Sequence, residues 1–77
     1  MSLDQFISDF VEAVEDLEAD AVGPQTDYRN LPQWDSLALL SVISMVDFEY
    51  GVNLKADELK SPSTLEALYK LIQTKKG

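Results

Sequence analysis

The sequence predicts a small all-α domain, a four-helix bundle made of three main helices and one short helix. Three segments carry apolar residues at the spacing of an amphipathic helix, and the stretches between them contain Gly23, Pro24, Pro32, Gly51 and Pro62. No segment alternates apolar and polar residues as a half-buried strand would. Because 77 residues provide only one thin hydrophobic core, we expect residues 1–77 to form a single domain.

The first predicted helix covers residues 3–18. Ser2 and Gln5 form a capping-box pattern at its start, and its opposite face is acidic. Its apolar stripe consists of Leu3, Phe6, Ile7, Phe10, Val14 and Leu17. Gly23 and Pro24 prevent further helix, so residues 20–34 are predicted to form a long loop. We expect this loop to be held to the core by Tyr28, Leu31 and Trp34.

The second predicted helix begins after Asp35, whose carboxylate is placed to accept a backbone N–H two or three residues on. It is expected to end near Tyr50, before Gly51. Almost all of its circumference is apolar, through Leu37, Leu39, Leu40, Val42, Ile43, Met45, Val46 and Phe48. An ordinary surface helix keeps a polar face. This segment is therefore either the central packing helix or a helix that offers apolar surface to a partner or ligand, and both explanations can hold.

The last helix is predicted to follow Pro62, after a single short turn at residues 57–60. Ser63 and Glu66 form a second capping-box pattern. Its apolar stripe contains Leu65, Leu68, Tyr69 and Ile72. Lysines at positions 70, 75 and 76 lie toward the C-terminal end, where the helix dipole favours cations.

The charge balance is strongly acidic, with 14 Asp and Glu residues against 6 Lys and Arg residues and a net charge of -8. Such a chain is repelled by nucleic acids and by anionic membranes, so we expect neither as a partner. The acidity favours either simple solubility or docking to basic patches on partner proteins. No apolar segment approaches the roughly 20 residues that span a bilayer, and no signal-peptide pattern is present at the start. We expect a soluble, cytoplasmic protein.

Cysteine and histidine are both absent. Their absence excludes disulfides, thiolate nucleophiles, imidazole bases and nearly every transition-metal site. An EF-hand is excluded as well, because the segment from Asp47 to Asn53 lacks the further acidic ligands and the correctly placed glycine. No nucleophile–base pair or phosphate-binding loop is visible, and most of the acidic residues fall on the solvent-facing sides of helices. We therefore expect a protein without catalytic activity of its own and without a metal.

The segment Trp34-Asp35-Ser36-Leu37 is the most specific feature of the chain, with a serine at a helix start between an acidic residue and a leucine. It resembles the attachment motif of acyl carrier proteins. The resemblance continues without a gap through the apolar helix to Leu54 and on to Ser63-Thr64-Leu65, and it extends more loosely over the whole chain.

The resemblance implies that Ser36 carries a 4'-phosphopantetheine arm, attached from coenzyme A by a separate phosphopantetheinyl transferase. It implies that Asp35 helps the transferase to recognise the site, in addition to capping the helix. Three residues would serve partner docking: Leu37, Asp47 and Glu49. Four would line a cavity for the acyl chain: Leu40, Ile43, Met45 and Val46. Further partners would be an acyl-loading ligase or acyltransferase and downstream synthase enzymes, visited by a monomeric carrier.

The sequence also departs from the pattern of carriers for fatty acid synthesis. Those proteins have acidic residues where this chain has Ala38 and Ser41, and a glycine two residues before the motif aspartate, where this chain has Gln33. The departures favour a specialised carrier over the housekeeping fatty acid carrier. Fatty acid, polyketide and other lipid pathways all stay open, as does an aminoacyl or peptidyl carrier. A different class of protein, an acidic helical interaction module without a prosthetic group, also remains as an alternative.

Overall fold

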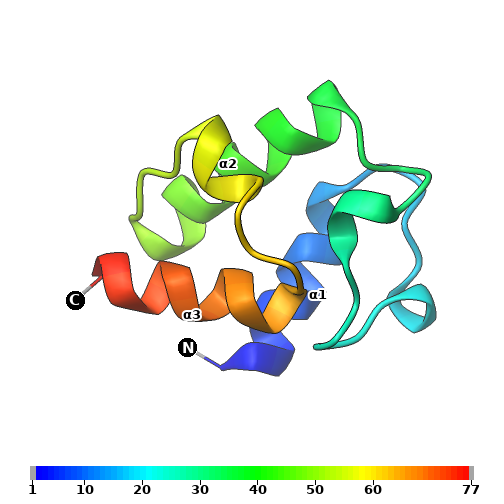
Figure 1. Ribbon diagram of the computed structural model, residues 1–77, viewed down its shortest axis with the longest axis horizontal. Coiled ribbons are helices and arrows are strands. Elements are labelled where there is room, and N and C mark those ends of the chain that lie inside the picture. The colour runs from blue at the N-terminus through cyan, green and yellow to red at the C-terminus, as the bar shows by residue number, and fades with distance from the viewer. Residues whose placement is uncertain (1, 77) are drawn as a thin grey trace.

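The structure, a computed structural model, describes residues 2–76, and within this range every regular element is helical (Figure 1). The three α-helices are α1 (Leu3–Ala13), α2 (Ser36–Tyr50) and α3 (Leu65–Lys76). Short 3-10 helices lie in the connections, as η1 (Ala19–Ala21), η2 (Tyr28–Asn30) and η3 (Ala56–Leu59). The predicted all-α class is confirmed. None of the described helices has both the length and the apolar character needed to cross a membrane.

Helix α1 is shorter than predicted, because it ends at Ala13 instead of continuing to residue 18. Val14 is already extended, and Asp16 adopts a left-handed conformation with a φ of 65°. Acidic side chains near a helix C-terminus oppose the negative end of the dipole, and aspartate tolerates the left-handed region better than most residues. At the other end, the Ser2 hydroxyl accepts the N–H of Gln5 at 3.2 Å, as predicted.

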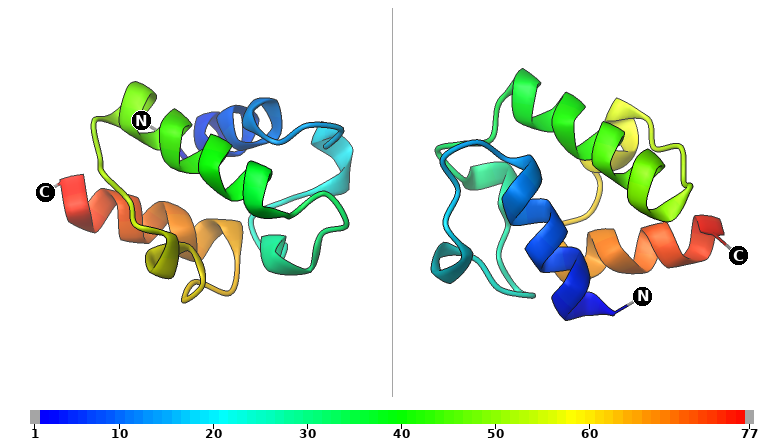
Figure 2. Two further views of the ribbon diagram at one scale, coloured as in Figure 1. Left: turned by 90° about the horizontal axis from the view of Figure 1, so that it is seen from above. Right: turned by 180° about the vertical axis from the view of Figure 1, so that it is seen from behind.

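Helix α2 has the bounds that the sequence predicts. Asp35 caps its start, and Gly51 ends it with a φ of 66°, in the left-handed region where glycine has no steric penalty. Figure 2 shows α2 beside α1, and α1 also contacts α3. The inner face of α2 is buried through Ala38, Val42, Val46 and Tyr50. The helix is therefore a central packing element, although its outer side is also apolar.

The start of α3 differs from the prediction. Thr64, and not Ser63, caps the helix, with its Oγ1 atom accepting the N–H of Ala67 at 3.0 Å. The first N–H groups of the helix, from Leu65 and Glu66, donate to carbonyls of the long loop at 3.1 and 2.9 Å. A helix start that is tied to the loop in this way has no need of the Ser63–Glu66 capping box.

An aromatic cluster fixes the long loop to the core. The ring of Phe10 lies 5.8 Å from that of Trp34, nearly parallel to it, and 5.7 Å from that of Tyr28. Tyr28 is fully buried, and its hydroxyl donates to the carbonyl of Leu59 at 2.6 Å. Leu31 and Trp34 are partly buried against the same core. The expectation that these side chains anchor the loop is confirmed.

The buried hydroxyl of Tyr28 makes the fold sensitive to alkali. Burial raises the pKa of Tyr28 from 10.0 to about 12. The unfolded chain can hold the charged phenolate of Tyr28 more easily than the folded protein can. The neutral Tyr28 side chain therefore contributes its full stabilisation of the fold below pH 10, and this stabilisation is lost as the pH rises through about 12. We expect phenolate absorbance and loss of helical circular dichroism to rise together in this window.

The control for this prediction is Tyr28→Phe, which keeps the ring but removes the ionisable hydroxyl. The free energy of unfolding of each protein is compared with its own value at neutral pH. Between pH 10 and about 12, Tyr28→Phe should lose less of this free energy than wild type does. A Tyr28 phenolate that forms near pH 10 in an intact fold would contradict the prediction.

Candidate functional site

The candidate site lies at the N-terminus of α2, where Ser36 is the first helical residue. Asp35 is extended and accepts the N–H of Ala38 on its Oδ1 atom at 2.8 Å, while its carbonyl accepts the N–H of Leu39 at 2.9 Å. Ser36 is exposed, and its hydroxyl has no hydrogen-bond partner among residues 2–76. The Asp35 cap thus fixes the backbone at the helix start while the serine side chain stays free.

The same helix end offers unpaired donors beside Ser36. The carboxylate of Asp35 accepts the N–H of Ala38, and its carbonyl accepts the N–H of Leu39. The N–H groups of Ser36 and Leu37 have no acceptor within the described part of the chain. Free N–H groups and the positive end of the dipole stabilise an anionic group attached at this point. No described side chain bonds the Ser36 hydroxyl.

The structural contribution of Asp35 is open to a direct test. We expect Asp35→Ala to lower the free energy of unfolding by about 1 kcal/mol, because the N–H of Ala38 loses its acceptor. Asp35→Asn should keep most of this stability, since an amide oxygen also caps a helix. Urea unfolding followed by circular dichroism measures both. An Asp35→Ala protein as stable as wild type would show that the cap contributes nothing.

The outer side of α2 exposes large apolar side chains next to and beyond Ser36. Leu37 is 61% exposed, Leu40 62% and Phe48 85%. Leu37 thus lies on the surface beside the serine. Asp47 and Glu49 are also exposed, near the far end of the helix. The three residues expected to dock partners are therefore all accessible, although they do not form one cluster.

The four residues expected to line an acyl-chain cavity do not surround a common space in this structure. Val46 is fully buried in the core, whereas Leu40 points to solvent, and Ile43 and Met45 are partly buried. The reason is geometric. Successive residues of a helix are about 100° apart, so these four positions face different sides of α2.

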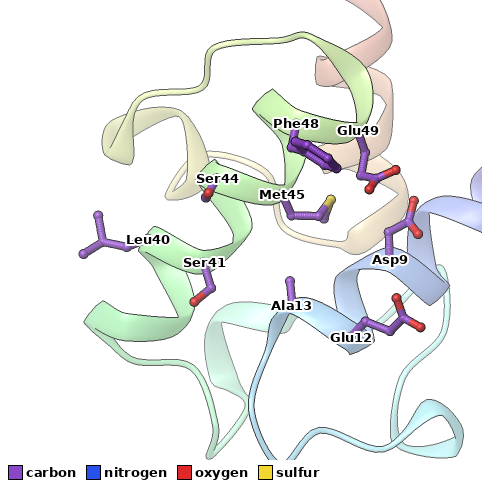
Figure 3. A pocket seen from close by; sticks show the side chains of 9 residues that line it. All are labelled: Asp9, Glu12, Ala13, Leu40, Ser41, Ser44, Met45, Phe48 and Glu49. Atoms are coloured by element: carbon purple, nitrogen blue, oxygen red, sulfur yellow. The ribbon is translucent and has the colours of Figure 1, made fainter.

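A surface groove runs between α1 and α2, and two of those four residues, Leu40 and Met45, belong to its lining (Figure 3). Its volume is about 530 Å³. It is lined by Asp9, Glu12, Ala13, Leu40, Ser41, Ser44, Met45, Phe48 and Glu49. A second hollow of about 530 Å³ continues toward the start of α2 and includes Gln33, Asp35 and Leu37 in its lining.

Sequence reasoning missed this groove. The acidic face of α1 was visible in the sequence, but nothing local indicates that Asp9 and Glu12 lie opposite Met45 and Phe48 on α2. Asp9 also bonds to α2 directly, accepting the hydroxyl of Tyr50 at 2.6 Å. This bond, together with burial as the larger cause, raises the pKa of Tyr50 well above its usual value.

The acidic residues of the described chain do not gather into a metal site, since no group of three His, Cys, Asp or Glu residues within 2–76 is placed to hold an ion. Comparison of the chain with protein-family models, with curated proteins and with solved structures gives no match. The function proposed below therefore rests on the residues and geometry of this chain.

Proposed function

We propose that this protein is an acyl carrier protein that bears a 4'-phosphopantetheine arm on Ser36. The observation that carries the proposal is the exposed, unbonded Ser36 hydroxyl at the capped start of an apolar helix, directly after Asp35 and before an exposed Leu37. The arm supplies a thiol that holds an acyl group as a thioester. Since the chain has no cysteine, this thiol would be its only one.

The attachment is a phosphoryl-type transfer catalysed by another protein. The Ser36 Oγ atom attacks the phosphorus of coenzyme A that bears pantetheine, an O–P bond forms, and the bond to the other phosphate breaks to release 3',5'-ADP. The serine proton passes to a base of the phosphopantetheinyl transferase. The free N–H groups of Ser36 and Leu37 then face the negative charge of the resulting phosphodiester.

The exposed residues of α2 support the partner roles that the resemblance implies. Leu37 is exposed beside the arm, and Asp47 and Glu49 are accessible on the same helix. We assign them to docking of the transferase, of an acyl-loading ligase or acyltransferase, and of downstream synthases. An acyl chain held by Leu40, Ile43, Met45 and Val46 would require α2 to move away from its packed position, because Val46 is fully buried.

The two positions on α2 that depart from fatty acid carriers are both at least partly buried. Ala38 is 4% exposed and packs in the core, so a carboxylate at this position would be buried. Ser41 lies in the groove beside α1. The acidic residues of α2 are thus confined to its last turn. This supports a specialised carrier, for polyketide, modified-lipid or aminoacyl cargo, over the general fatty acid carrier.

One observation favours a second candidate function, an acidic interaction module without a prosthetic group. The large exposure of Phe48 and Leu40 gives α2 a surface suited to protein contacts whether or not Ser36 is modified. This alternative gives no reason for an unbonded serine directly after the helix cap.

The test is the intact mass of the protein before and after incubation with coenzyme A, magnesium and a broad-specificity phosphopantetheinyl transferase. A gain of one phosphopantetheine, located on Ser36 by peptide fragmentation, supports the carrier function. A folded protein that stays unmodified would overturn it in favour of the interaction module.

A further inference from the structure

The second hollow lies directly beside the attachment point of the proposed arm. Asp35 and Leu37, the residues before and after Ser36, both line it, and its volume is about 530 Å³. Ala13, at the end of α1, and Asp16, in the turn that follows, belong to the same lining. A group attached to Ser36 therefore enters this hollow by passing Asp35 or Leu37.

The apolar part of the hollow consists of small or rigid side chains. Ala38 is 4% exposed, and Ala13 is partly buried against the core. Pro32 also belongs to the lining. Such side chains leave room for a compact branched aliphatic group. The pantetheine arm has a group of this kind close to its phosphate, a carbon atom that bears two methyl groups.

Gln33 contributes a buried acceptor without a partner to this part of the molecule. Its Nε2 atom donates to the carbonyl of Asp16 at 3.4 Å, while its Oε1 atom is buried and has no hydrogen-bond partner within residues 2–76. The Asp16 carbonyl can pair only with a donor, so turning the amide over would place two acceptors against each other. Buried acceptors are almost always bonded, and this exception is explained by a donor from outside the chain.

The polar side chains around the hollow are mostly acceptors. Four carboxylates line it, those of Glu12, Glu15, Asp16 and Asp35, and no lysine or arginine of the described chain does so. Such a lining repels a phosphodiester, which is stabilised instead by the free N–H groups at the start of α2. The hollow accepts neutral N–H and O–H donors, because carboxylates are strong acceptors for them.

From this arrangement we infer that the second hollow holds the first part of the pantetheine arm, and that Gln33 Oε1 accepts a hydrogen bond from it. The inference rests on the proposed function. After its phosphate the arm carries a hydroxyl and then an amide N–H, so its first donors lie within a few bonds of Ser36. Gln33 is three residues before Ser36. A rotation of its amide, against the long bond to Asp16, turns the oxygen toward these donors.

The position of Gln33 makes this contact a property of this chain. Gln33 stands where carriers for fatty acid synthesis have a glycine, which has no side chain to accept a hydrogen bond. An arm that is held by Gln33 would run along the side of α2 that faces α1. The inference therefore goes beyond attachment of the arm, since it assigns the arm a resting position and a residue that holds it there.

The experiment compares the unmodified protein with the protein that carries the arm, after intact mass has shown complete modification. The protein is isotopically labelled and the arm is not, so that isotope-filtered NOE spectra report contacts between the two. We expect NOEs from the arm methyl groups to the methyl groups of Ala13 and Ala38. The side-chain amide resonance of Gln33 should shift on modification more than the amide resonances of the other glutamines.

Gln33→Leu tests the hydrogen bond, because leucine keeps most of the volume and removes the acceptor. Loss of one hydrogen bond should lower the ratio of held to free arm about fivefold, seen as weaker NOEs to Ala13 and Ala38. The unmodified variant should be at least as stable as wild type, since it leaves no buried oxygen unpaired at this position. The matched control, Gln25→Leu, changes a glutamine of the same loop that bonds to Glu66 outside the hollow, and the NOEs should stay unchanged.

Three results would overturn the inference. In the first, the fully modified protein gives no NOEs between the arm and the second hollow. In the second, the arm contacts α3 instead, which would place it on another side of α2. In the third, Gln33→Leu keeps the NOEs at wild-type strength, or Gln25→Leu weakens them as much as Gln33→Leu does.

The mass measurement separates these results from a failure of the proposed function. A wild-type protein that gains no mass with the transferase would overturn the carrier function and this inference together. A full gain of mass without contacts in the second hollow would overturn this inference and leave the carrier function in place.

Discussion

The Ser36→Ala variant is expected to keep its unmodified mass after incubation with coenzyme A and a phosphopantetheinyl transferase, while wild type gains one phosphopantetheine. The variant lacks the only atom that attacks the phosphorus, so the loss should be complete. Its fold should be unaffected, because Ser36 is exposed and its hydroxyl bonds to nothing in residues 2–76. Intact-mass spectrometry and circular dichroism measure the two properties on the same sample.

The matched control is Ser44→Ala, which removes an exposed serine two turns further along the same helix. This variant should be modified as fully as wild type, because Ser44 lies in the helix interior, where the backbone N–H groups are already bonded. Modification of Ser36→Ala to the wild-type extent would show that the arm is attached elsewhere and would remove the basis of the proposed function.

The ends of α2 were predictable because both signals are local. Asp35 caps through its own side chain, and Gly51 ends the helix through its own φ angle, so neither depends on distant residues. The end of α1 was not predictable in the same way. Its apolar spacing continues through Val14 and Leu17, and both side chains are buried, but a turn at Asp16 and not a helix brings them there.

The candidate site also has one feature that local sequence predicts and one that depends on packing between distant residues. The position of Ser36 at a capped helix start follows from three adjacent residues, so the sequence predicts it. The groove depends on how α1 packs against α2, and no local pattern shows that Asp9 meets Tyr50 or that Glu12 lies near Ser41. Periodicity also failed to separate the exposed Leu40 from the buried Val46, because α2 is apolar on nearly all sides.

The aromatic cluster around Phe10 should carry the largest single contribution to stability. Phe10 is fully buried, its ring stacks on Trp34, and it also contacts Phe6 and Tyr28. We expect Phe10→Ala to lower the free energy of unfolding by about 3 to 5 kcal/mol, through lost burial and the cavity left behind. A domain of this size has only about 4 to 12 kcal/mol in total. The variant should therefore lose a large part of the stability of the domain.

The chain provides a matched control for this change in Phe48, which is the same residue type with 85% of its surface exposed. Phe48→Ala should alter stability by no more than about 0.5 kcal/mol, since it removes few packed contacts. Urea unfolding of both variants, followed by circular dichroism, compares them directly. If Phe10→Ala remained within about 1 kcal/mol of wild type, the long loop would have to be held to the core by other contacts, because the ring that Tyr28 and Trp34 pack against would be gone.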